Sequence, residues 1–407
     1  MSSRRIFTSI LVTLLTVVGG SQLSASQWEF TLIAEAWATT APGTAMTFLT
    51  LDAPAYSSGR VVFAGTHASL VEGVWEWRDG QLGTVLSSSA LTFRGLPDVS
   101  GSMRSFSANG VVYSRDGGGS IVPIVDTMTP VPGGAGNFAS FRWTSTDGAS
   151  VAFTANGPGN GNATGVYSVP AGGGTVVKIA DLNDGFSSFS RPLAASAGFV
   201  VFTAYDPQIN PGVYRARVNG TGMTTVIDRN TPIPVPGVVG TFVAGTLHSI
   251  APAVSGDTAF VYGGNGDVRG IFRKRGAGGL EPVVTSLDSP PGTPDTFADF
   301  YAFSASGNDV AFIGAGFVGS DIPRGLFVIL NGQLEKVIDG SDTINGRPFR
   351  SMGLLPKGFD GRSVAFYVFL DDTNVDGIVL ARCLDCFSVF LDGFESGSTS
   401  RWSGIAP

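Results

Sequence analysis

Short apolar runs separated by turn-forming residues recur along the chain, and residues 188–237 show the pattern most clearly. Four runs can be recognised there: Phe189–Ala194, Phe199–Ala204, Gly212–Val218 and Thr224–Asp228. Val, Ile, Phe, Tyr and Thr dominate these runs, and Gly, Asn, Asp, Ser and Pro lie between them, which predicts β-strands. A Pro/Gly-rich loop follows the fourth run, and then the same pattern begins again.

The second run of each unit carries an aromatic residue near its end. These aromatic residues are Phe63, Tyr113, Phe153, Phe202, Phe260, Phe312 and Phe366, and they recur every 40 to 58 residues. A third run opened by glycine follows in most units, as at Gly73, Gly165, Gly212, Gly270, Gly325 and Gly377. Four strands repeated at this period are typical of β-propeller blades, because each sheet buries its faces against its neighbours.

The count predicts an all-β fold, a seven-bladed β-propeller of four-stranded antiparallel blades. The first six units cover residues 46–95, 102–128, 138–181, 188–228, 248–285 and 300–339. We expect the second blade to be narrow, because Asp116–Gly119 replaces the third strand there.

The seventh unit has three runs, Met352–Pro356, Ser363–Phe369 and Gly377–Arg382, but no fourth. The missing strand is expected at the other end of the chain, where residues 28–36 resemble a fourth run followed by its Pro-Gly loop. We therefore predict that an N-terminal strand joins the last blade and closes the ring, which removes the free edges of an open array.

The first 26 residues have the features of a secretory signal peptide. Arg4 and Arg5 precede the apolar run Ile6–Val18, and Ser24–Ser26 offers a cleavage site before Gln27. The run is short for a permanent transmembrane helix, and no other segment is long and apolar enough to span a membrane. We expect residues 27–386 to form the propeller of an exported protein, located in the periplasm, at the cell surface or outside the cell.

Composition limits the classes of partner. Only 14% of the residues are charged and the net charge is −7. This balance argues against nucleic acid, which binds a concentrated basic face. One dense basic run, at Arg269 and Arg273–Arg275, is expected on the third or fourth strand of a blade, near its outer edge, where charge would block pairing with other chains. We expect a monomer.

One turn has the spacing of a calcium loop. Asp372, Asn374 and Asp376 precede Gly377 in the order D-x-N-x-D-G, which places three oxygen ligands on one side of a tight turn. Calcium is the one cofactor that the sequence suggests, although the glutamate that ends an EF-hand loop is absent. The alternative is a turn in which the Asn and Asp side chains bind the backbone.

Cys383 and Cys386 are the two cysteines of the chain. In an exported protein a C-x-x-C pair is expected to be oxidised, so we predict a disulfide that closes the end of the propeller. A zinc site would need two further ligands, and His67 and His248 are the only histidines.

Hydrolytic motifs are absent, including G-x-S-x-G and H-E-x-x-H. Paired carboxylates from different blades could still meet at the mouth of the ring. The candidates are four residues expected in turns between second and third strands, Glu72, Asp206, Asp267 and Asp321. The alternative is that they are ordinary turn residues. No catalytic residue is predicted.

The last residues, 387–407, differ in character from the repeats. The short motifs Asp392-Gly-Phe-Glu-Ser-Gly397 and Trp402-Ser403 resemble a C-terminal tail of exported gammaproteobacterial proteins. The T-P-x-P-G loops, V-A-F strands and G-V-Y strands resemble an uncharacterised exported bacterial repeat family, similar in plan to propellers of the TolB type. That resemblance implies the fold and carries no catalytic residues.

The sequence therefore predicts an exported, non-enzymatic propeller that binds a protein or a glycan on the face where the long loops emerge. Two alternatives remain. One is a polysaccharide-acting lyase or hydrolase with its site at the channel mouth. The other is a structural or adhesive surface protein sorted through its C-terminal tail.

Overall fold

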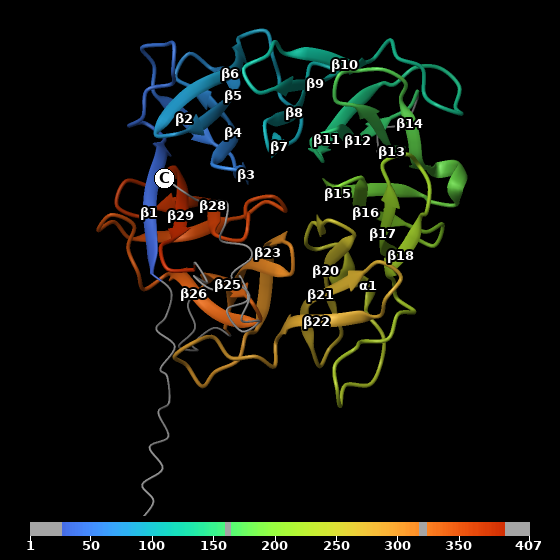
Figure 1. The fold of residues 1–407 in the computed structure, drawn as a ribbon, viewed down its shortest axis with the longest axis vertical. Coiled ribbons are helices and arrows are strands. Elements are labelled where there is room, and N and C mark those ends of the chain that lie inside the picture. The colour runs from blue at the N-terminus through green and yellow to red at the C-terminus, as the bar shows by residue number, and fades with distance from the viewer. Residues whose placement is uncertain (1–26, 159–163, 317–323, 387–407) are drawn as a thin grey trace, which may run out of the picture.

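The computed structural model describes residues 27–158, 164–316 and 324–386. These residues form seven sheets arranged in a ring, so the predicted seven-bladed β-propeller is confirmed (Figure 1). The helices among them are two short pieces, η1 (Leu182–Asp184) and α1 (Ala244–Leu247). The predicted signal peptide (1–26), the C-terminal tail (387–407) and Asp321 lie outside the described residues. No helix in the described ranges has the length and hydrophobicity needed to cross a membrane.

The blades are numbered in chain order and each contains four strand positions. Blade 1 comprises β2 (Phe48–Leu51) with β3 (Ala55–Ser57), β4 (Arg60–His67), β5 (Val71–Arg78) and β6 (Gln81–Ser88). Blade 2 comprises β7 (Asp98–Ser100), β8 (Met103–Ala108), β9 (Val111–Asp116) and β10 (Val122–Asp126). Blade 3 comprises β11 (Ser140–Thr146), β12 (Ser150–Asn156), β13 (Gly165–Pro170) and β14 (Val177–Asp181). Blade 4 comprises β15 (Ser188–Ser196), β16 (Phe199–Tyr205), β17 (Pro211–Arg217) and β18 (Thr224–Ile227).

The remaining blades follow the same plan. Blade 5 comprises β19 (Ala253–Ser255), β20 (Thr258–Gly264), β21 (Arg269–Arg275) and β22 (Leu280–Thr285). Blade 6 comprises β23 (Asp299–Ser306), β24 (Asp309–Ala315), β25 (Gly325–Leu330) and β26 (Gln333–Asp339). Blade 7 comprises β27 (Phe349–Gly353), β28 (Ser363–Leu370), β29 (Val375–Cys383) and, from the start of the chain, β1 (Trp28–Glu35).

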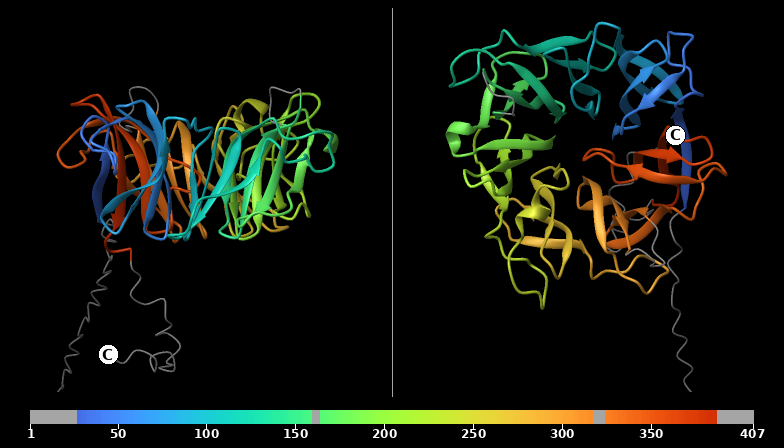
Figure 2. Two further views of the ribbon diagram at one scale, coloured as in Figure 1. Left: turned by 90° about the horizontal axis from the view of Figure 1, so that it is seen from above. Right: turned by 180° about the vertical axis from the view of Figure 1, so that it is seen from behind.

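Antiparallel pairing gives the ring two distinct faces. The first strand of each blade lies near the centre and the fourth lies at the outside (Figure 1). The turns between second and third strands and the connections between blades therefore share one face, which we call the upper face. The hairpins between first and second strands and between third and fourth strands form the lower face, where residues 27 and 386 also lie (Figure 2).

The N-terminal strand closes the ring as predicted. β1 pairs antiparallel with β29 from Trp28 opposite Cys383 to Glu35 opposite Gly377. The pairing continues beyond the strand, where the Leu384 N–H donates to the carbonyl of Gln27 at 2.8 Å. The first and last described strands thus belong to one sheet, and the chain leads from β1 in blade 7 directly into β2 of blade 1.

Blade 2 corrects the sequence interpretation. It contains four strands, and Asp116 ends the third strand while Gly117–Gly119 lie in the turn to the fourth, so this segment does not replace the third strand. Tyr113 is accordingly on the third strand, opposite Phe106 on the second. The sequence spacing assigned Tyr113 to the second strand because the turn between β8 and β9 is only Asn109-Gly110. This turn is shorter than the equivalent turn in the other blades.

Apolar side chains are buried between blades. The buried apolar residues of the described chain fall into seven clusters, and each cluster draws on two neighbouring blades. The cluster between blades 7 and 1, for example, packs Ile378 and Leu380 against Phe63 and Trp75. Because apolar burial is worth roughly 25 cal/mol per Å², each blade depends on both neighbours for its stability.

The repeated aromatic and glycine positions have one explanation. In blades 1, 2, 3, 4 and 6 the aromatic residue of the second strand faces an aromatic residue of the third, and the two rings stack. In blade 3 the pair is Phe153 and Tyr167, and Tyr167 lies over Gly165 at the start of β13. A Cβ atom at Gly165 would lie 2.6 Å from the Tyr167 hydroxyl oxygen and 2.8 Å from the Ala180 carbonyl oxygen.

We predict that Gly165→Ala lowers the free energy of unfolding by about 1–3 kcal/mol, because the methyl group has no room between a ring and a backbone carbonyl. Gly172→Ala, in the next turn of the same blade, is the matched control, since nothing lies within 4 Å of its added Cβ. Urea unfolding of both variants tests the packing. Equal effects of the two substitutions would contradict it.

Candidate binding surface

Hydrogen bonds and buried side chains fix the connections between blades at the upper face. In the connection from blade 2 to blade 3, Asp126 accepts hydrogen bonds from Met128 N–H and the Thr129 hydroxyl. Two residues further on, Val131 is buried in the cluster between the two blades. The T-P-x-P-G loops are therefore part of the core at their middle residue, and they present the residues on either side in a fixed arrangement.

Exposed apolar side chains concentrate on the upper face. Of the twelve large apolar residues exposed in the described chain, nine lie in its turns and connections or at the inner start of a blade. These nine are Trp37, Met46, Leu70, Met128, Ile209, Val239, Val243, Leu287 and Tyr301. The other three, Val122, Met223 and Leu384, lie toward the lower face. We call the set of nine the apolar rim, and exposed apolar surface of this kind is typical of interaction sites.

Three rim residues, Trp37 (φ 63°), Leu70 and Ile209, have a left-handed backbone conformation that suits other residue types. Leu70 (φ 57°) and Ile209 (φ 62°) adopt the left-handed conformation in the turns between second and third strands of blades 1 and 4. Asn374 (φ 53°) adopts it in the corresponding turn of blade 7. Asn tolerates this conformation, whereas Leu and β-branched Ile are outliers there. Local stability therefore does not explain why Leu70 and Ile209 are present.

Bulges shape the inner end of several blades at the upper face. The pairing between first and second strands shifts register directly after Phe141, Phe300 and Phe349. A bulge removes a residue from the regular alternation and re-aims its side chain. The bulged residues include Tyr301 and Arg350, both exposed. The upper mouth of the ring thus carries aromatic and cationic side chains delivered by the same local distortion.

A mostly buried polar network lies near the lower end of the channel. The Asp98 carboxylate accepts hydrogen bonds from the Ser145 hydroxyl (2.6 Å) and the Thr146 N–H (2.8 Å). Lys357 Nζ lies 3.3 Å from the same carboxylate and also donates to the Thr146 carbonyl. The Lys357 carbonyl accepts from the Tyr56 N–H.

This network, the central polar network, joins blades 1, 2, 3 and 7 across the ring. The residues around it leave a cavity of only about 30 Å³, enough for roughly one water molecule.

The sequence did not predict the central polar network, and the rarity of lysine was the one available signal, since the chain has only four.

Acidic side chains meet where blade 7 joins blade 1 at the upper face. Burial raises the pKa of Asp52, and the nearby carboxylates of Asp376 and Glu72 raise it further. The Tyr367 hydroxyl donates to Asp376 Oδ1 at 2.5 Å, and burial together with this contact raises the pKa of the phenol. The structure thus brings two sequence-predicted candidates, Glu72 and Asp376, into one electrostatic neighbourhood.

The predicted calcium residues have protein partners in this structure. Both carboxylate oxygens of Asp372 accept hydrogen bonds from Arg347, and these bonds lower the pKa of Asp372. Asp376 accepts from Tyr367 and from the Leu51 N–H. Calcium at Asp372, Asn374 and Asp376 stays a prediction, and a bound ion would have to replace these partners.

The other candidate carboxylates are separated. Glu72 accepts the Phe93 N–H at 2.7 Å in blade 1. Asp206 binds both the backbone and the side chain of Asn210 in a turn of blade 4, which lowers its pKa. Asp267 lies in a turn of blade 5, where its N–H donates to Asn265. These three residues serve different blades and do not form a pair for acid–base catalysis.

The remaining predicted residues have structural environments. His67 is buried at the end of β4 and accepts from the Ser69 N–H. His248 follows α1, with its ring 6.0 Å from that of Tyr205. Cys383 and Cys386 lie at disulfide distance, with 5.5 Å between their Cα atoms.

The basic run Arg269–Arg275 is on β21, the third strand of blade 5, which is one of the two expected positions, and β22 covers its outer side. Its side chains bind neighbouring residues, including Glu281 and Asp299.

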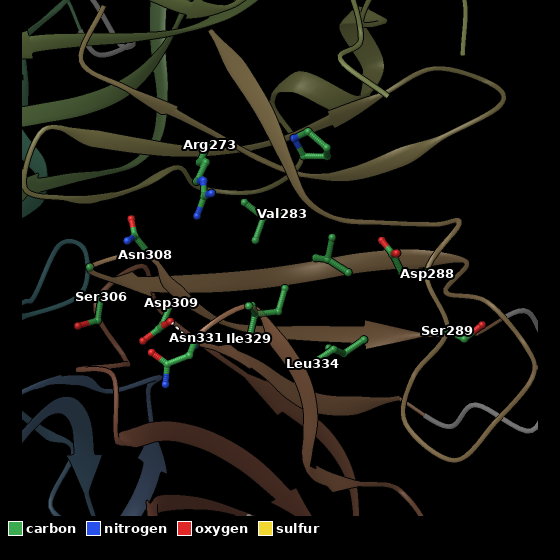
Figure 3. Close-up of a pocket in the computed structure, with 14 residues that line it drawn as sticks. Arg273, Val283, Asp288, Ser289, Ser306, Asn308, Asp309, Ile329, Asn331 and Leu334 are labelled. Carbon is green, nitrogen blue, oxygen red and sulfur yellow. Dashed lines mark hydrogen bonds between the residues drawn. The ribbon is translucent and has the colours of Figure 1, made fainter. Parts of the chain in front are cut away.

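A groove of about 730 Å³ separates blades 5 and 6 on the outer wall of the ring. Figure 3 shows Val283 of β22 on one side and Ile329 and Leu334 of blade 6 on the other. Asp309 lies at one end, where it accepts the Asn331 N–H at 2.9 Å, and burial raises its pKa. The groove has room for an extended segment, and it runs from the lower hairpins of blade 6 to the upper-face connection at Asp288 and Ser289.

The central polar network gives a stability prediction. Asp98→Ala should lower the free energy of unfolding by about 3 kcal/mol, because it leaves Lys357 without its carboxylate in a mostly buried site. Adding Lys357→Met should recover part of that loss, since the unpaired charge is then removed. Urea unfolding of the single and double variants measures both effects. A double variant less stable than Asp98→Ala would contradict the network.

Comparisons with known proteins support the fold. Neither a protein-family model nor a curated protein matches the sequence. Among solved structures, the chain is similar to a puromycin-hydrolyzing peptidase of Mycobacterium tuberculosis, with a TM-score of 0.50, 15% identity, and coverage of 83% of this chain and 52% of the peptidase. This chain thus spans about half the length of that protein.

Two further structures show a weaker likeness. The β-propeller domain of the Trilobed protease from Pyrococcus furiosus gives a TM-score of 0.48 at 12% identity, covering 83% of this chain and 94% of that one. A putative TolB from Agrobacterium tumefaciens gives 0.38 at 14% identity, covering 64% and 84%. At these identities the likeness concerns the fold alone, and the chain is a seven-bladed β-propeller.

Proposed function

We propose that this chain is an exported binding protein that docks a protein partner on its upper face. The observation that carries the proposal is the apolar rim, with Leu70 and Ile209 held in left-handed turns. Export is inferred from the sequence of residues 1–26.

A functional cause fits the rim because its residues are exposed and do not fill a core, and Leu70 and Ile209 also do not suit their turns. Bulky residues in the left-handed region cost of order 1 kcal/mol each and persist where other requirements outweigh that cost. Projecting an aliphatic side chain from a rigid turn prepares a contact before binding, which reduces the entropy lost on association.

A protein partner is favoured over a glycan by the chemistry of the rim. Seven of the nine rim residues are aliphatic or methionine, with Trp37 and Tyr301 the two aromatic exceptions. Interface cores between proteins bury such side chains and deplete charge. The dispersed positions also match a broad surface and not a single sugar-sized cleft.

The rim predicts a trade between stability and binding. Leu70→Asn and Ile209→Asn should each raise the free energy of unfolding by up to about 1 kcal/mol, because Asn tolerates the left-handed conformation and the lost side chains are exposed. Asn374→Leu, in the corresponding turn of blade 7, is the reciprocal control and should lower it. Urea unfolding measures all three. Destabilisation by both Asn substitutions would remove the argument from the turns.

The same substitutions test binding. The immobilised chain should retain a protein partner from an envelope extract of its source cells, and the Leu70→Asn, Ile209→Asn double variant should lose that partner by tenfold or more, on the order of two interface side chains. A lower-face variant, Val122→Thr with Met223→Gln, should retain it.

Mass spectrometry of the retained proteins provides the readout. Proteins retained equally by the wild-type chain and both variants would contradict docking on the upper face. Retention of a polysaccharide and of no protein by the wild-type chain would assign a glycan ligand instead.

A further inference from the structure

A pocket at the upper face between blades 6 and 7 has a composition that the apolar rim does not explain. Its volume is about 320 Å³, and its walls include Arg324, Phe349, Arg350, Met352 and Asp371. The volume is at the lower end of the range for ligand sites. Two guanidinium groups from different blades thus line one small hollow beside apolar side chains.

Each arginine is positioned by an aromatic ring. The Arg324 guanidinium lies over the Tyr301 ring, 3.9 Å from its centroid, and that of Arg350 lies 4.1 Å from the centroid of Phe369. Such stacking uses the face of the guanidinium group and leaves its N–H edge available for a hydrogen-bonded anion.

Local backbone features fix this arrangement. Tyr301 and Arg350 are the bulged residues of the first strands of blades 6 and 7. Arg324 directly precedes β25, and its carbonyl accepts the Gly340 N–H at 3.1 Å. Two equivalent bulges in neighbouring blades, and a residue anchored at the start of a strand, therefore converge on one pocket.

The charges of the pocket are incompletely matched. Within the described ranges, the Arg324 guanidinium has no carboxylate or carbonyl partner. Arg350 Nε lies 3.7 Å from Asp371 Oδ1, beyond hydrogen-bonding distance, and both side chains are about half exposed. Two arginines and one aspartate leave a net positive charge in the pocket, and Asp371 already shows that a carboxylate fits beside Arg350.

We infer that this pocket binds a carboxylate group, and that in the complex the group is an acidic side chain of the docked protein. Arg324 and Arg350 donate to its two oxygens. Asp371 competes with the incoming carboxylate for Arg350. The identity of the carboxylate's carrier rests on the proposed function, whereas the pocket itself can be tested without a partner.

The test uses the full exported chain and a diglutamate peptide blocked at both ends, with the diglutamine peptide as an uncharged control of equal shape. Calorimetric titration should show that the wild-type chain binds the acidic peptide and not the amide. Arg324→Gln and Arg350→Gln should each weaken binding about tenfold or more, as expected for a lost charge-assisted hydrogen bond.

Two further variants sharpen the result. Asp371→Asn should tighten binding of the acidic peptide, because it removes a competing carboxylate, and Arg78→Gln should leave it unchanged. Arg78 is an exposed arginine at the lower end of blade 1, so its substitution makes the same change in net charge at a distance.

Several results would overturn the inference. Equal binding of the two peptides, no loss in the Arg324 and Arg350 variants, or an equal loss in Arg78→Gln would each do so. Binding of inorganic phosphate or sulfate in place of the peptide would overturn the carboxylate assignment.

The Leu70→Asn, Ile209→Asn variant separates this inference from the proposed function. It should bind the peptide normally while losing the protein partner. The peptide titration therefore tests the pocket, and retention of the partner tests the apolar rim.

Discussion

The fold depends on the burial of apolar blade faces between neighbouring blades around a closed circle. A single four-stranded sheet would leave both faces in water, and an open row of such sheets would leave two faces and two edges exposed. Seven apolar clusters lie between the blades, and the cluster between blades 7 and 1 exists because β1 completes the last sheet. The pairing of β1 with β29 therefore gives the first blade the same environment as the rest.

The two faces of the closed ring have different structures. The centre near the lower face is filled by Asp98, Lys357 and their partners, which connect blades across the ring. The upper face carries the long connections, whose middle residues are buried and whose flanking residues are more exposed. A scaffold with this support can hold Leu70 and Ile209 in conformations that isolated turns would avoid. The rigid blades thus make it possible for the upper face to carry residues in unfavourable backbone conformations.

Much of the fold could be predicted from the sequence because each blade repeats the same constraints. The Gly-x-aromatic pattern reflects a ring lying over a glycine, as Tyr167 lies over Gly165, so it recurs wherever that packing recurs. Blade 2 was misread because a two-residue turn at Asn109-Gly110 shifted Tyr113 onto a different strand from the equivalent aromatic residues. The period identifies a blade more reliably than it identifies a strand within it.

The candidate site could be predicted only in part, since it depends on contacts between blades. Asp98 and Lys357 are far apart in the chain, and each resembles an ordinary turn residue. Leu70 gives no turn signal at all, because its backbone conformation contradicts its residue type. Arg324 and Arg350 become neighbours only through two bulges, which no spacing in the sequence reveals. The upper face was predicted correctly as the face of the long loops, but its chemistry required the structure.

Native-state hydrogen exchange of the backbone amides, followed by mass spectrometry, tests the closed ring most directly. If the blades form one cooperative unit, the slowest amides of β1 should exchange as slowly as those of β29 and of the central strands in the other blades. Fast exchange in residues 28–35 with continued protection of blades 1 to 6 would contradict the account, because closure would then contribute little to the stability of the ring.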